Sequence, residues 1–149
     1  MQEKTGGDLA PIIDILKSIK KLSALAEGYN NSIEFYNSLD HKPFQNSLEL
    51  IISMGIASKK ISNGMKKKHP EIPWHVMKSF VEVREKECTL LNRSIIFDLI
   101  KDKLLCIAGF FEGIILEELE NKNFDVEEYN RYANVELDIH MDLENVVKD

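Results

Sequence analysis

Two short runs of charged residues have the composition of a phosphate-binding site. Lys66, Lys67 and Lys68 follow one another directly, and Arg84, Lys86 and Glu87 lie within a second charged stretch. Lysine and arginine both neutralise phosphate charge, so either run could contact RNA. A lysine, however, cannot act as a proton shuttle near neutral pH unless it is strongly desolvated. The pattern of both runs favours the ordinary alternative, which is a solvated helix end for the lysines and local surface ion pairs around Arg84.

The cysteines and histidines do not form a pattern typical of a metal or disulfide site. Cys88 and Cys106 are the only thiols and lack a Cys-x-x-Cys spacing, so we expect two buried free thiols, no metal and no cofactor. His69 could lie near a ligand, although helix capping or hydrogen bonding within a turn is favoured. Trp74 is expected to pack in the core rather than to stack on a base.

The net charge of −6 over 149 residues is unevenly distributed. Residues 121–149 contain three basic and eight acidic side chains, a net −5, which leaves −1 for residues 1–120. The acidic total therefore does not exclude nucleic acid as a partner of the first part. We divide the chain into a helical domain, 1–120, and an acidic extension, 121–149.

Helical periodicity dominates residues 1–120 and predicts the elements that must position these side chains. The first helix should bury one apolar stripe, with Asp8 as its cap and Gly28 as its stop. Further helices are expected at 44–66, from Trp74 to about residue 91, and at 95–119, with a short helix near 33–39. The segment 104–111 is apolar nearly all round, which predicts a helix buried on most sides. Small residues would allow another helix to approach closely in two places, at Gly55 and at the Gly109/Gly113 pair. The contact at Gly109 and Gly113 could lie either in the core or at a dimer interface.

The tail has a different period. Residues 135–143 alternate apolar and polar side chains, which is typical of a half-buried strand. Three alternatives remain open, namely docking on another chain, pairing with a second copy, or a helical extension whose alternation is accidental.

The run His69-Pro70-Glu71-Ile72-Pro73-Trp74 resembles a motif of the HepT-like HEPN family. These are four-to-five-helix proteins encoded beside a MNT nucleotidyltransferase as toxin–antitoxin pairs. The resemblance extends over about residues 9–120. It includes the runs 12–16 and 50–57 and the apolar residues 95–97, where the family usually has an apolar pair followed by tryptophan.

The resemblance implies an all-α bundle and a homodimer, but not the family's chemistry. Family members use an Arg-x4-His-x-Tyr motif for metal-independent RNA cleavage, and the partner enzyme AMPylates the tyrosine. Counted from Trp74, those three positions hold Val81, Lys86 and Cys88. We therefore expect a dimeric interaction protein that lacks the conventional ribonuclease site. The alternative is a ribonuclease toxin with an altered site at Arg84, Lys86 and Glu87, neutralised by a MNT-type antitoxin.

The sequence also predicts a location. Residues 1–7 lack the apolar core of a secretory signal, and the most apolar run, 104–116, contains Glu112 and is shorter than the roughly 20 residues of a membrane span. We expect a cytoplasmic protein without a membrane partner.

Overall fold

The computed structural model describes residues 6–84 and 90–136, and these residues form an all-α bundle without any strand. This confirms the predicted fold class. The longer helices are α1 (Leu9–Ala26), α3 (Lys42–Lys59), α6 (Leu90–Asp98), α7 (Leu104–Glu120) and α8 (Val126–Glu136). A π-helical turn, Leu99–Lys103, joins α6 to α7. The short helices are α2 (Ser32–Asn37), α4 (Asn63–Lys68) and α5 (Trp74–Ser79).

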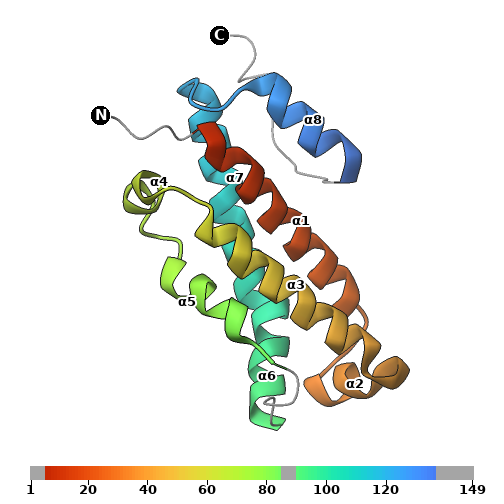
Figure 1. Ribbon diagram of the computed structural model, residues 1–149. Helices are drawn as coiled ribbons and strands as arrows, with labels where there is room; N and C mark the ends of the chain where they lie inside the picture. The colour runs from red at the N-terminus through yellow and green to blue at the C-terminus, as the bar shows by residue number, and fades with distance from the viewer. Residues whose placement is uncertain (1–5, 85–89, 137–149) are drawn as a thin grey trace.

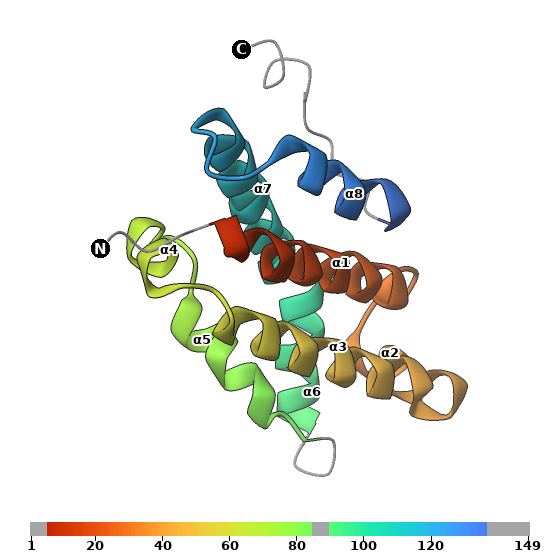
Figure 2. The same cartoon turned by 45° about the horizontal axis from the view of Figure 1, so that its top comes forward.

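The bundle is organised around α1 and α3, which lie side by side (Figure 1). The α6–α7 helix runs behind this pair, and α8 packs on α1 near the C-terminal end of α7 (Figure 2). None of the described helices combines the length and the apolar character needed to span a membrane.

The predicted stripe of α1 forms the centre of the core. Its apolar positions are all buried, namely Leu9, Ile12, Ile13, Leu16, Ile19, Leu22 and Ala26. Gly28 follows the helix with φ of 89°, the left-handed conformation that glycine adopts without strain. Asp8 occupies the N-cap position of α1 as predicted, but its side chain makes no capping hydrogen bond to that helix. Its buried carboxylate accepts hydrogen bonds from the backbone N–H and the hydroxyl of Ser62, at 2.8 and 2.7 Å.

The predicted helix 44–66 is divided in two by Ser62. Helix α3 ends at Lys59, and the Ser62 side chain accepts a hydrogen bond from the Met65 N–H to begin α4. Because Asp8 binds the Ser62 N–H, that group is not available to continue α3.

The close approach predicted at Gly55 is present. A Cβ at Gly55 would lie 2.8 Å from Cγ1 and 2.9 Å from the backbone N of Val81. Helix α3 therefore packs directly on the 3-10 turn Phe80–Glu82 that follows α5.

The helix predicted from Trp74 ends much earlier than residue 91. Helix α5 stops at Ser79, and the chain is extended at Val83. The expected break between about residue 91 and residue 95 was also wrong, because α6 begins at Leu90 and continues through these residues. Cys88 lies outside the described residues.

Helix α7 is buried on one side only, contrary to its all-round apolar composition. Leu105 and Phe110 are 50% and 44% exposed, and Cys106 is exposed rather than buried. A Cβ at Gly109 or Gly113 would meet nothing within 4 Å, so these glycines mark no helix contact within the described chain.

The first part of the acidic extension belongs to the core. Phe124 and Tyr129 are both 2% exposed and pack with the bundle. Burial, together with the charge of Glu112, raises the pKa of Tyr129 to about 12. Residues 135 and 136 of the predicted strand are helical, in α8, and residues 137–143 lie outside the described residues.

Candidate functional site

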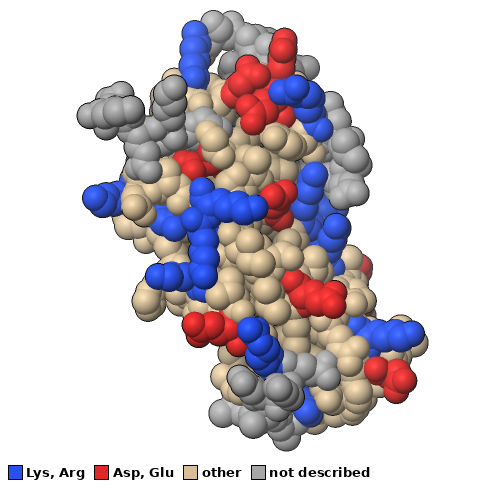
Figure 3. All heavy atoms as spheres, in the orientation of Figure 1, with Lys and Arg blue, Asp and Glu red and all other residues tan. Residues whose placement is uncertain are grey.

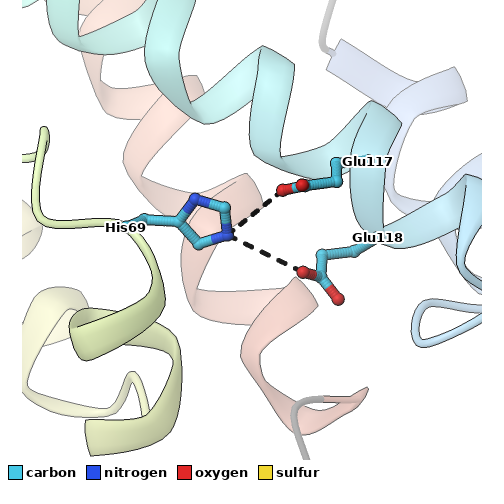
Figure 4. A group of neighbouring side chains, drawn as sticks. All are labelled: His69, Glu117 and Glu118. Carbon is cyan, nitrogen blue, oxygen red and sulfur yellow. Dashed lines mark ion pairs between the residues drawn. The ribbon is translucent and has the colours of Figure 1, made fainter.

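A cluster of ionisable side chains lies where the end of α4 meets the end of α7 (Figure 4). We call it the His69 cluster, and it consists of Lys68, His69, Glu71, Glu117 and Glu118. The first three come from α4 and the turn that follows it, and the two glutamates are neighbours near the end of α7.

The turn that carries His69 is fixed by its own hydrogen bonds and by Trp74. The His69 N–H donates to the carbonyl of Met65 at 3.1 Å, and the indole N–H of Trp74 donates to the His69 carbonyl at 2.9 Å. The Trp74 ring packs edge-on against Phe111 of α7, with ring centroids 5.6 Å apart. The prediction of a hydrogen-bonded turn is therefore confirmed, and Trp74 packs against the core while remaining half-buried itself, which brings the turn against α7.

Glu118 is a fully buried carboxylate with two donors. Lys68 Nζ lies 2.6 Å from Oε1, and Asn123 Nδ2 donates to Oε2 at 2.7 Å. Burial alone would raise the pKa of Glu118, but the hydrogen bonds from Lys68 and Asn123 outweigh it and lower that pKa. The same bond to Glu118 raises the pKa of Lys68.

His69 is buried among carboxylates, with its side chain only 8% exposed. Nδ1 lies 3.2 Å from Oε1 of Glu71. Nε2 points toward α7, 3.5 Å from Oε2 of Glu117 and 3.7 Å from Oε1 of Glu118 (Figure 4). Within the described part of the chain this buried nitrogen has no hydrogen-bond partner. One imidazole nitrogen and two carboxylates thus converge from different elements, a set that can hold a proton or a cation.

The structure separates the lysines predicted to contact RNA. Lys66 is half-buried, Lys67 is exposed, and Lys68 is neutralised by Glu118. Basic side chains gather over α4, α5 and the adjacent end of α3, on the face shown in Figure 3. On this face a hollow of about 260 Å³ is lined by Lys59, His75 and Lys78, together with Ser79, Val81 and Glu82.

Of the second predicted group, only Arg84 is described. It is exposed, and its guanidinium donates to the carbonyls of Val81 and Val83 at 3.0 and 2.8 Å. Lys86 and Glu87 lie outside the described residues.

Sequence reasoning missed both Glu118 and the exposed face of α7. Glu118 follows Phe111 by seven residues and so falls on the buried stripe of α7, where an apolar residue is expected. A charged residue at such a position was the signal in the sequence for a buried carboxylate. The exposed face has at its centre what we call the α7 strip, which comprises Leu105, Cys106, Gly109, Phe110 and Gly113. No periodicity signal distinguishes this face from the buried one, because both are apolar.

Comparisons with known proteins identify no relative, since no family model, curated protein or solved structure matches this chain.

Proposed function

We propose that this chain is a HepT-like HEPN protein of a toxin–antitoxin type system that acts as a homodimeric interaction protein in the cytoplasm, without the conventional ribonuclease site. The observation that carries the proposal is the α7 strip. In this strip Leu105 and Phe110 are exposed to solvent, whereas the opposite face of α7 is buried in the core.

The shape of the α7 strip suits a second helix. Around the circumference of α7, the larger Leu105 and Phe110 flank three small residues, Cys106, Gly109 and Gly113. A Cβ at either glycine would have no atom within 4 Å. Small residues between large ones let two helix backbones approach closely. Covering Leu105 and Phe110 contributes about 1 kcal/mol each, since full burial of such a side chain is worth about 1.5–3 kcal/mol and each is half-buried already. A two-fold dimer doubles that contribution.

The packing of Val81 supports the proposal that the ribonuclease site is absent. Val81 stands where the family motif has its arginine, and it packs against Gly55. A charged side chain there would have to leave this contact, because Val81 packs the 3-10 turn after α5 against α3.

Solution mass tests the dimer directly. We expect a mass of twice 17.1 kDa by light scattering for the full chain, and a monomer for the Leu105→Asp/Phe110→Asp variant. The control is Ile33→Asp on α2, which changes a side chain that is equally exposed, at 55%, but outside the α7 strip. A dimer that persists in the double variant would remove this assignment of the interface.

The partner implied by the resemblance is a MNT-type nucleotidyltransferase antitoxin. Co-expression with a nucleotidyltransferase encoded next to this chain, followed by co-purification, tests that part. Absence of such a gene would argue against the toxin–antitoxin setting.

One observation favours the alternative of an altered ribonuclease. The basic hollow is lined by Val81, which occupies the position of the family's arginine, and Lys59, His75 and Lys78 could bind RNA phosphates there. RNA cleavage by the purified chain that Arg84→Ala and Lys86→Ala both abolish would establish the altered ribonuclease and overturn the non-enzymatic proposal.

A further inference from the structure

The His69 cluster contains a buried nitrogen that lies at ion-pair distance from two carboxylates but has no hydrogen-bond partner among the described residues. His69 is 6% exposed, and its Nε2 faces two carboxylate oxygens without a hydrogen bond to either. Buried polar atoms are nearly always satisfied, so an orphan nitrogen aimed at two acceptors needs an explanation.

The position of Glu71 indicates the His69 tautomer with its hydrogen on Nδ1, and in that tautomer Nε2 can bind a metal. A hydrogen on Nδ1 can be donated to Oε1 of Glu71, 3.2 Å away, which leaves the lone pair on Nε2. A carboxylate that binds the far nitrogen of an imidazole is the usual support for a metal-ligating histidine. The lone pair then faces the carboxylates of Glu117 and Glu118, which repel it. A cation placed between the three groups would attract all of them.

The charges of the cluster match a divalent ion. Glu71, Glu117 and Glu118 contribute three negative charges and Lys68 one positive charge, so with a neutral His69 the cluster carries a net −2. The spacing also fits. Two ligands bound tetrahedrally at about 2.0–2.1 Å lie about 3.3 Å apart. The observed Nε2–oxygen separations of 3.5 and 3.7 Å exceed that value only slightly, and all three ligand atoms lie within 4.8 Å of one another, so binding would draw the ligands closer together.

We propose that His69, Glu117 and Glu118 bind one Zn²⁺ and that Glu71 orients His69 for this purpose. The mixed nitrogen and oxygen ligands favour Zn²⁺ over Mg²⁺ and Ca²⁺, which prefer oxygen alone. All three ligand atoms lie within 4.8 Å of one another, and water can complete the coordination. This inference is independent of the proposed function.

Lys68 competes with the ion for Glu118. Its ammonium sits 2.6 Å from the same Oε1 that faces His69, but its side chain is 41% exposed and can turn into solvent. Bound Zn²⁺ would then take the place of Lys68 as the counter-charge of Glu118. It would join the turn after α4 to the end of α7, two segments about fifty residues apart in the chain.

Zinc titration of the full, chelator-treated chain tests the site, with calorimetry for affinity and thermal unfolding for stability. We expect one Zn²⁺ per chain at the cluster and a Zn²⁺-dependent rise in Tm that Mg²⁺ does not produce. His69→Gln and Glu117→Gln should each abolish the rise. Glu71→Gln should weaken binding by about 10–100-fold, the effect typical of groups that orient a ligand. Lys68→Met should tighten binding, because it removes the competing charge.

Two matched controls exclude other sites. His75→Gln and Glu120→Gln change an exposed histidine and an exposed glutamate outside the cluster, and both should bind Zn²⁺ as the unmodified chain does. Glu117 is 50% exposed at its side chain, so Glu117→Gln keeps the test valid if His69→Gln does not fold. The proposal is overturned if Zn²⁺ fails to raise Tm, or if the rise survives in Glu117→Gln.

Discussion

Lys68 Nζ and Glu118 Oε1 lie 2.6 Å apart, and this ion pair joins the end of α4 to a fully buried position of α7. Removing one charge from such a pair leaves the other buried without compensation, which costs more than removing both. The pair therefore stabilises the contact between α4 and α7 only as long as both partners are present.

A double-mutant cycle on this pair should show strong coupling. We expect Lys68→Met to lower the free energy of unfolding by about 1–3 kcal/mol, less than for a fully enclosed pair because the Lys68 side chain is 41% exposed. Lys68→Met/Glu118→Met should regain at least half of this loss in urea unfolding with a chelator present. Lys67→Met, on the same exposed helix end, should change stability by no more than about 0.5 kcal/mol. Equal losses for Lys67→Met and Lys68→Met would contradict the role of the pair.

The same pair should give stability a defined pH dependence. The folded-state pKa of Glu118 is lowered below 4.5, so its contribution is present above pH 4.5 and is lost as pH falls through the folded pKa. The pKa of Lys68 is raised above 10.5, so its contribution is present below pH 10.5 and is lost as pH rises through the folded pKa. Urea midpoints should decline more steeply at both extremes for the unmodified chain than for Lys68→Met/Glu118→Met. Parallel curves for the two proteins would show that other groups control the pH dependence.

Local periodicity was enough to predict most helices but not how the chain pairs distant residues. The stripe from Leu9 to Ala26 has a helical period and one apolar face, so α1 followed from the sequence. The Ser62 N–H is bound by Asp8, 54 residues away, and does not continue α3, and periodicity contains no information on that contact.

The candidate site was beyond prediction for the same reason. His69 meets Glu117 and Glu118 only because Trp74 packs on Phe111 and brings the turn against α7. Helix α7 shows a second limit, since a helix that is apolar all round does not reveal which of its faces the rest of the chain covers.

The glycines of α3 and α7 should respond in opposite directions to the same substitution. Gly55→Ala places a methyl group 2.9 Å from the backbone N of Val81 and 3.1 Å from the Met77 carbonyl oxygen, so we expect a loss of about 1–3 kcal/mol. Gly109→Ala meets nothing within 4 Å in a helix interior, so we expect a gain of about 0.5–1 kcal/mol.

Both changes belong in the Leu105→Asp/Phe110→Asp background, where association through the α7 strip cannot contribute to stability. Chemical unfolding provides the measurement. A neutral Gly55→Ala would mean that α3 and the turn after α5 separate at little cost, contrary to the packing at Val81.

Two truncations of the acidic extension should separate its structural part from any docking role. Deleting residues 129–149 removes Tyr129, which is 2% exposed in the core, so we expect a loss of about 3 kcal/mol or more. We therefore expect this deletion to destabilise the helical core, so any change in association that it causes would not by itself indicate a docking role of the tail. Deleting residues 137–149 keeps all described core side chains, and we expect its thermal midpoint to match that of the full chain. Light scattering of this shorter deletion then tests whether the tail docks. If self-association weakens while Tm is unchanged, the tail contributes to the dimer interface. If self-association is unchanged, the α7 strip remains the interface.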